Sequence, residues 1–254
     1  MGAVRVPAAT ATIITMITGT ITAMTTTTSI SAGDLYRLMA WFSPGYPIGA
    51  FSYSHGIEYA VETGVVKTAA DLSQWIGHVL RHGAGWVDAV LLKEAYAAAD
   101  DPAALADLAD LAAAWRGSQE MALEANQQGG SFLSVTRATW GHPALDDFAQ
   151  SRGDEPVPLC IAVGLAAAAH RLDLPAVLAA YLHAFAANLV SAAVRLIPLG
   201  QTDGQRALAA LLPVVDSVLP CALACPLEDC GTAAPMVDLC SMRHETQYTR
   251  LFRS

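Results

Sequence analysis

Apolar residues recur at helical spacing through most of this chain, and this pattern limits the fold more than any other feature. Large apolar residues fall three or four positions apart in segments such as 72–80 and 178–189. That spacing places them on one face of a helix, and the alternation typical of a half-buried strand does not occur over any useful length. No repeat period is evident. We therefore predict an all-α protein, a compact single-domain array of about eight to ten helices.

The first 30 residues differ in composition from the rest of the chain. They are rich in Thr, Ala and Ile, and Arg5 is their only charge. Threonines interrupt every apolar run, so the segment lacks the continuous apolar core of a signal peptide. We predict a disordered Thr-rich extension over residues 1–30 and a helical domain over residues 31–254, with no membrane partner. Residues 174–194 have the length of a membrane span, but His183, Asn188 and a high alanine content favour a buried core helix.

Composition and charge favour protein partners over nucleic acid or lipid. Hydrophobic residues make up 54% of the 254 residues and charged residues only 15%, which is more apolar surface than a lone monomer usually hides. A net charge of −9 argues against nucleic acid, whose binding depends on phosphate neutralisation. Lys67 and Lys93 are the only lysines, which argues against an anionic membrane surface. Five cysteines, an odd number without CxxC spacing, indicate a reducing, cytoplasmic location.

Breaking and capping residues predict the bounds of the helices. Asp101-Pro102 is a typical helix start, and Gly83 and Gly85 end the helix that holds residues 72–80. Further expectations are a break or bend at Gly129-Gly130, loops over 146–158 and 219–235, a bend at Pro213, and Asp88 and Lys93 facing water on a helix over 87–99.

Residues 43–59, here called the Pro–Gly segment, interrupt the alanine- and leucine-rich sequence. Pro44, Gly45, Pro47 and Gly49 interrupt a helix, so residues 44–49 are predicted to form an ordered turn. From Ser52 the spacing becomes helical, with Ser52 or Ser54 available as the cap. A polar, aromatic loop that leads into a helix N-terminus offers free backbone N–H groups, which is typical of a recognition surface.

The Pro–Gly segment also contains groups that could do chemistry. His55 and Glu58 lie three residues apart, which suits a metal pair or an acid–base pair, or alternatively a structural role in which His55 bonds the loop backbone. A nucleophile at Ser52 or Ser54 would need a histidine and an acid such as Asp203, but the chain has no G-x-S-x-G motif. It also lacks a phosphate-binding glycine motif, so we predict no enzyme activity, no resident metal and no nucleotide bound by this chain.

Three cysteines lie close together in sequence at Cys221, Cys225 and Cys230, beside Glu228 and Asp229. Soft thiolates can hold a metal ion. The alternative is a proline-containing loop whose thiols have no ligand role.

Two further polar stretches follow. Asn188, Ser191 and Arg195 share a helix face and precede residues 201–206, so they form either a buried capping network or a protein-contact face. The tail, residues 236–254, is aromatic and basic. Such a segment is expected to order on a surface, its own or a partner's, and the Pro–Gly segment is a candidate for that surface.

Three stretches in order resemble the UreF family of urease accessory proteins. They are Pro47-Ile-Gly-Ala-Phe-Ser-Tyr-Ser-His-Gly-Ile-Glu58, Ala193-Val-Arg-Leu-Ile-Pro-Leu-Gly-Gln-Thr-Asp-Gly-Gln-Arg206 and His244-Glu-Thr-Gln-Tyr-Thr-Arg-Leu-Phe-Arg-Ser254. The resemblance runs from about Leu35 to the last residue, whereas residues 1–30 and the cysteine cluster fall outside its pattern.

The resemblance implies a non-enzymatic, all-α maturation factor that dimerises and binds the accessory protein UreD, also called UreH. This platform would recruit the GTPase UreG, which binds the GTP, while the complex delivers nickel to apo-urease. The alternative is a nickel-binding or hydrolytic protein that uses His55, Glu58 and the Cys221–Cys230 cluster. The candidate partner-binding residues are Pro47, Phe51, Tyr53, His55, Glu58, Arg195, Gln201, Asp203, Gln205, Arg206, His244, Tyr248, Arg250, Phe252 and Arg253.

Overall fold

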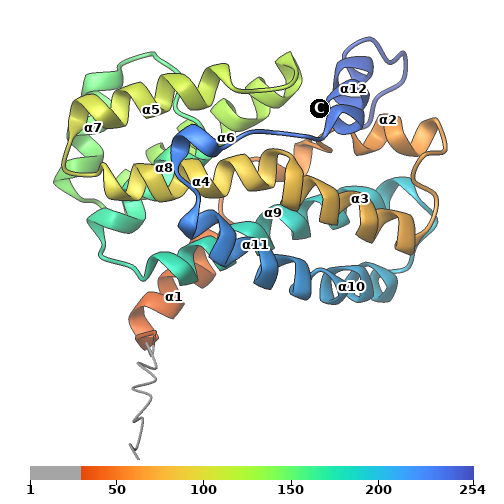
Figure 1. Cartoon of the computed structure of the whole chain (residues 1–254), viewed down its shortest axis with the longest axis horizontal. Helices are drawn as coiled ribbons and strands as arrows, with labels where there is room; N and C mark the ends of the chain where they lie inside the picture. The colour runs from red at the N-terminus through yellow and green to blue at the C-terminus, as the bar shows by residue number, and fades with distance from the viewer. Residues whose placement is uncertain (1–29) are drawn as a thin grey trace, which may run out of the picture.

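The computed structural model describes residues 30–254, and the helices in that part of the chain confirm the all-α class (Figure 1). All but the last residue of the expected 1–30 extension lie outside the described residues. The α-helices are α1 (Ala32–Trp41), α2 (Ile57–Glu62), α3 (Ala69–His82), α4 (Ala84–Ala97), α5 (Pro102–Ala114), α6 (Gln119–Thr139), α7 (Pro143–Arg152), α8 (Leu159–Ala169), α9 (Leu174–Leu196), α10 (Gln201–Ala210), α11 (Leu212–Ala224) and α12 (Pro235–His244). Two short 3₁₀ turns are η1 (Ala50–Ser52) and η2 (Leu227–Asp229).

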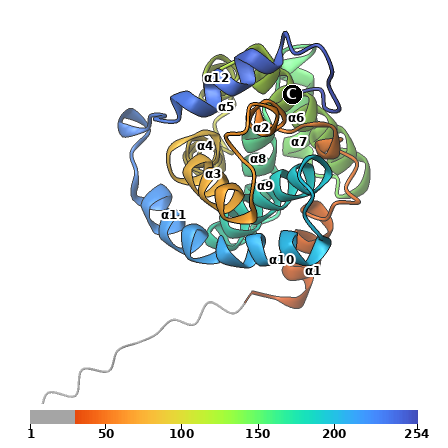
Figure 2. The same ribbon diagram turned by 90° about the vertical axis from the view of Figure 1, so that its right-hand side faces the viewer.

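The helices surround a core built on α4, α8 and α9. Viewed end-on, α8 and α9 lie in the middle of the array, with α12 on one side and α10 and α11 on the opposite side (Figure 2). Nearly every residue of α8 is buried, which explains why its sequence is apolar on all faces. Two segments of the described chain are long and apolar enough to cross a membrane by length and composition alone. They are α9 and the run Gln201–Ala224, which holds α10 and α11. Half of the apolar stretch of α9 is buried in the array, as a core helix requires.

Two glycines let backbones approach each other closely in this core. A Cβ on Gly164 of α8 would lie 2.6 Å from the Leu92 carbonyl oxygen of α4. A Cβ on Gly129 would lie 1.9 Å from the carbonyl oxygen of Val157. The expected break at Gly129-Gly130 is therefore wrong: α6 continues through both glycines, and Gly129 serves close packing.

Three other expectations about the elements are wrong for local reasons. Residues 143–152 form α7 instead of a loop, because Pro143 occupies the first helical position and the His142 ring caps the Ala144 N–H at 3.3 Å. The helix before residue 219 continues to Ala224 with Pro220 inside it. Asp88 is buried, although its position on α4 was expected to face water. The helix expected to bend at Pro213 is divided just before that residue, where α10 ends at Ala210 and α11 begins at Leu212.

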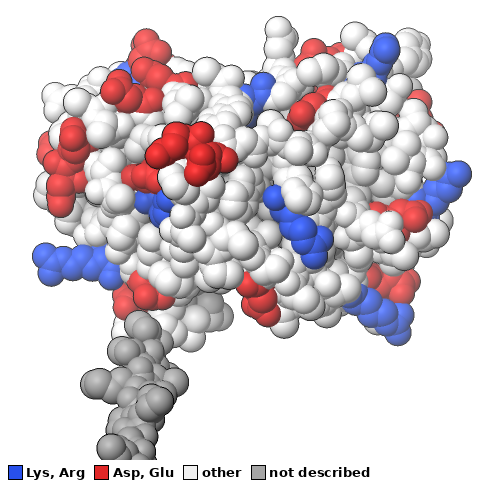
Figure 3. All heavy atoms as spheres, viewed as in Figure 1, with Lys and Arg blue, Asp and Glu red and all other residues white. Residues whose placement is uncertain are grey.

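The molecular surface is apolar in places and unevenly charged. Acidic side chains gather over the end of the molecule that holds α5 and α7, while large areas of the same face carry no charge (Figure 3). Helix α1 projects from the array in Figure 1 and exposes Tyr36 and Met39. Helix α12 exposes Met236, Leu239 and Met242 at intervals of three residues, which puts them on one face.

Candidate functional site

The tail folds back onto the Pro–Gly segment of its own chain. The Arg253 N–H donates to the Ser52 carbonyl oxygen at 2.8 Å, and the Ser54 N–H donates to the Ser254 carbonyl oxygen at 2.7 Å. The Phe252 side chain is only 4% exposed. Of the two surfaces on which the tail was expected to order, the structure describes its own.

Arg195 fastens the contact from the side of α9. Its guanidinium lies 4.3 Å from the centre of the Phe252 ring, and its Nη2 donates to the Phe51 carbonyl oxygen at 2.9 Å. A cation over an aromatic face is attracted by the ring quadrupole. One side chain thus contacts both the tail and the Pro–Gly segment.

Glu58, in the first turn of α2, holds the backbone of the tail. Its Oε1 accepts the Leu251 N–H at 2.6 Å, and its Oε2 accepts the Phe252 N–H at 2.9 Å. Its carboxylate is buried, and these bonds replace the water that burial removes. The helix itself begins after Gly56, whose φ of 80° suits glycine, so neither expected serine is the cap residue. Ser54 Oγ instead accepts the Glu58 N–H at 3.4 Å.

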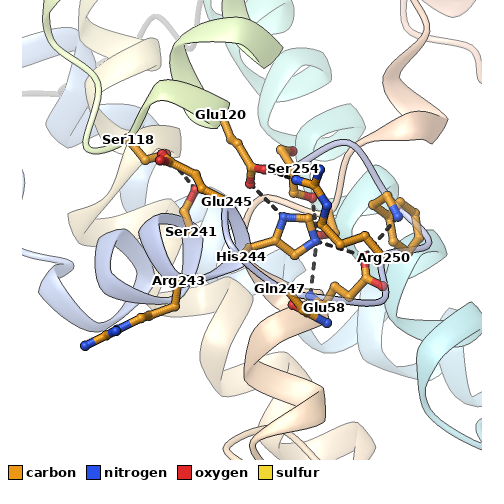
Figure 4. Close-up of polar contacts among 12 residues, drawn as sticks. Glu58, Ser118, Glu120, Ser241, Arg243, His244, Glu245, Gln247, Arg250 and Ser254 are labelled. Carbon is orange, nitrogen blue, oxygen red and sulfur yellow. Dashed lines mark hydrogen bonds and ion pairs between the residues drawn. The ribbon is translucent and has the colours of Figure 1, made fainter.

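His244, at the end of α12, lies between two carboxylates (Figure 4). Its Nε2 is 3.0 Å from Glu58 Oε2, and its Nδ1 is 2.7 Å from Glu120 Oε2. Since both ring nitrogens face carboxylate oxygens, either the ring carries both protons or one carboxyl group is protonated. Arg250 Nη1 completes this group at 2.8 Å from Glu120 Oε1.

A third carboxylate, Glu124, lies one turn further along α6. His55 Nδ1 is 3.2 Å from its Oε2, which also accepts from Ser254 Oγ at 3.1 Å. Its Oε1 accepts from Gln128 Nε2 at 3.3 Å. We call Glu58, Glu120 and Glu124 the carboxylate cluster. Most of its partners come from the tail, so the tail neutralises buried charge as well as covering apolar surface.

The geometry does not support the chemical alternatives for His55 and Glu58. His55 has a φ of 55° and precedes α2, and the two side chains have separate partners, Glu124 and His244. No group of three or more His, Cys, Asp or Glu residues in the described part of the chain is arranged to hold a metal ion. The structural role expected for His55 is fulfilled through a side chain of α6 instead of the loop backbone.

The cysteine cluster has few properties of a thiolate site. Cys221 is exposed and Cys230 is buried. Burial raises the pKa of the Cys230 thiol to about 11, which disfavours the thiolate form that binds metal. The Cys225 carbonyl oxygen accepts from the Lys93 ammonium, so this segment is also tied to α4.

The expected partner-binding residues divide by exposure. The buried ones, which shape the surface from within, are Tyr53, His55, Glu58, His244 and Phe252. The ones on the surface are Pro47, Phe51, Arg195, Gln201, Gln205, Arg206, Tyr248, Arg250 and Arg253. Asp203 is partly exposed; its Oδ2 accepts the Gly200 N–H at 3.3 Å and its Oδ1 pairs with Arg206 at 2.8 Å. It therefore stabilises the start of α10 from the surface and not as part of a buried network.

Sequence analysis missed the α6 members of the site. Glu120 and Glu124 are spaced four apart in α6, so they share one face of the helix, but only the structure shows that both are buried. A second missed network joins Asp88 to Arg116 Nη1 at 2.8 Å and to the Tyr181 hydroxyl at 2.7 Å. Burial and the neighbouring Asp88 carboxylate raise the pKa of Tyr181 well above its usual value, so its hydroxyl stays a donor.

A cavity of about 420 Å³ opens beside the Pro–Gly segment and α9. Aromatic residues line much of it, including Trp41, Tyr46 and Phe185, and Glu124 and Gln128 also reach it. The site thus combines an exposed loop, a fastened tail and an apolar hollow on one side.

Fold and site together define an all-α protein whose buried polar centre holds its own tail against a surface loop. The family model for UreF matches residues 66–212. Three similar proteins, each called urease accessory protein UreF, come from Rhodopseudomonas palustris (52% identical over 87% of this chain and 94% of the relative), Granulibacter bethesdensis (52%, over 88% and 96%) and Bradyrhizobium diazoefficiens (46%, over 91% and 99%). The chain belongs to the UreF family of urease accessory proteins. Its relatives are named as accessory proteins and not as enzymes.

Proposed function

We propose that this chain is a non-catalytic platform in urease maturation, which binds UreD (UreH) and recruits the GTPase UreG in the cytoplasm. The observation that supports this most is the fastening of the tail to the Pro–Gly segment through the carboxylate cluster. GTP is bound by UreG, nickel is handled by the complex and delivered to apo-urease, and this chain needs no tightly bound cofactor.

The proposed UreG-docking surface consists of the exposed residues that the fastened tail brings together: Phe51, Arg195, Tyr248, Arg250 and Arg253. Phe51 is 68% exposed and Tyr248 is fully exposed, although large aromatic side chains usually avoid water. Aromatic and arginine side chains contribute much of the binding energy in protein interfaces. Their exposure on a rigid support is what a docking surface requires.

Two other exposed apolar regions support further partners. The face of α12 formed by Met236, Leu239 and Met242 suits UreD, since methionine side chains adapt to a partner's surface. The projecting α1, with Tyr36 and Met39 exposed, suits a homodimer contact.

Co-purification tests the UreG assignment. We expect Phe51→Ala and Tyr248→Ala to lower the amount of UreG that co-purifies with this chain and UreD, because both side chains are exposed and their loss leaves the core intact. Arg137→Ala is the matched control: its ion pair with Asp146 lies on the surface at the end of α6, away from the tail.

Circular dichroism of each variant should match the unaltered protein. If UreG recruitment is the same for both aromatic variants and for the control, this surface is not the docking site.

A further inference from the structure

A pair of exposed histidines on α3 has no part in the proposed docking surface. His78 and His82 lie four residues apart, so their side chains share one face of the helix. The centres of their rings are 5.0 Å apart and the ring planes meet at 49°. Two histidines at this spacing on a helix are a recurring way to hold one transition-metal ion.

The His78 ring is already oriented by a neighbouring segment. Its Nε2 lies 3.2 Å from the Ala233 carbonyl oxygen, which can only accept a hydrogen bond. In the neutral ring the proton is therefore on Nε2 and the lone pair is on Nδ1. Histidines that bind metals commonly donate their other ring N–H to a carbonyl in this way.

The segment that orients His78 is itself fixed to α3. The His82 carbonyl oxygen accepts from the Ala233 N–H at 2.7 Å and from Thr232 Oγ1 at 3.1 Å. The Ala233 carbonyl oxygen that contacts His78 therefore belongs to a segment whose position is fixed by hydrogen bonds to the backbone of His82. This lowers the entropy that the ring would lose on binding an ion.

The ring separation fits an ion between the two histidines. A metal about 2.1 Å from each ligating nitrogen lies roughly 3.2 Å from each ring centre, so ligand angles between 90° and 110° place the centres about 4.5–5.2 Å apart. The observed 5.0 Å falls within this range.

We propose that His78 and His82 form an open two-histidine site for a divalent first-row transition ion, with water at the remaining positions. Imidazole suits nickel, copper and zinc alike, and two protein ligands leave the ion open to water, unlike the four that close a structural zinc site. No larger cluster of ligating side chains occurs in residues 30–254, so the ion would exchange readily. The site stands apart from the docking proposal, since it uses α3 and residues 232–233.

Calorimetric titration of the full chain, purified without a histidine tag, with NiCl₂ tests the proposal. We expect one nickel per chain, and His78→Ala or His82→Ala should weaken binding by about 10–100-fold or more, at least as much as loss of an outer-shell partner does. His183→Ala, which removes a single exposed histidine on α9, is the matched control and should bind like the unaltered chain.

A second readout uses Cu²⁺ as a spectroscopic probe. Its paramagnetic resonance spectrum should show coupling to two imidazole nitrogens in the unaltered chain and to one in either variant.

Unchanged nickel affinity in both variants would overturn the proposal. So would loss of binding in a Cys221→Ser, Cys225→Ser double variant, which would assign the ion to the thiols. Circular dichroism confirms that each variant is folded, and both histidines are exposed, so the core does not depend on them.

Discussion

At the scale of single residues, the site depends on buried charges that satisfy one another. Glu58, Glu120 and Glu124 are each less than a tenth exposed, and each accepts hydrogen bonds from the tail. A buried carboxylate without such partners would be costly. The tail is therefore held as much by the need to neutralise these groups as by the burial of Phe252.

The two side chains that contact Glu120, His244 and Arg250, should contribute very differently to stability. His244 is completely buried between two carboxylates, so His244→Ala should lower the free energy of unfolding by about 3–5 kcal/mol. The Arg250 side chain is 40% exposed, and Glu120 keeps its bond to His244, so Arg250→Ala should cost about 1 kcal/mol or less.

Urea denaturation followed by circular dichroism measures both changes in the free energy of unfolding. Arg137→Ala, which removes a surface ion pair, is the control, and its change should be near zero. Equal losses for His244→Ala and Arg250→Ala would contradict this ranking.

At the scale of the elements, the path of each helix follows from close contacts as much as from helix propensity. Helix α6 passes through two adjacent glycines with different surroundings. A Cβ on Gly129 would overlap the backbone at residues 157–159, whereas a Cβ on Gly130 would have no atom within 4 Å.

Alanine substitutions at these two positions should have opposite effects. Gly129→Ala should destabilise the protein strongly, because the new methyl group must displace backbone before α8. Gly130→Ala should stabilise it by up to about 1 kcal/mol, since alanine is the better helix former and the site is open. Thermal unfolding of the two variants provides the comparison, and a stabilised Gly129→Ala protein would contradict the packing described here.

The same helix indicates how far the sequence predicts the structure. Helical spacing and caps predicted α3, α5 and α9 closely, because those signals are local. The spacing could not tell that Gly129 meets another backbone, or that Asp88 is paired with Arg116 and Tyr181, because those contacts join distant segments. The Pro–Gly segment and the tail were recognisable by composition, but Glu120 and Glu124 lie in an ordinary polar helix and only the fold brings them to the site.

At the scale of the whole molecule, the contacts proposed for different partners fall on separate surfaces. The part of the tail after α12, residues 245–254, forms one surface with the Pro–Gly segment; the outer face of α12 is another, and the projecting α1 a third (Figure 1). The charged residues that Figure 3 shows over α5 and α7 lie at the end opposite α12. A scaffold that holds several proteins at once needs this kind of separation.

Substitution on α12 should affect UreD more than the fold. Leu239 is 45% exposed on the outer face, so Leu239→Asp introduces a charge into the proposed UreD contact without disturbing the core. We expect less UreD to co-purify, while the unfolding midpoint stays close to that of the unaltered chain. Asp107→Ala is the control, because it changes the charge at an exposed position on α5, away from α12, and should leave UreD binding unchanged. If the Leu239→Asp chain retains UreD fully, the outer face of α12 is not the UreD contact.

The bonds between Ser54 and Ser254 join residues 200 positions apart. During synthesis the Pro–Gly segment leaves the ribosome long before its partner exists, and contacts of such large separation form late. Until then Glu58 and Glu124 lack their tail partners, so the proposed docking surface cannot take its final shape. A chain that lacks residues 251–254 would therefore fail to present the proposed docking surface, although the Pro–Gly segment itself is intact.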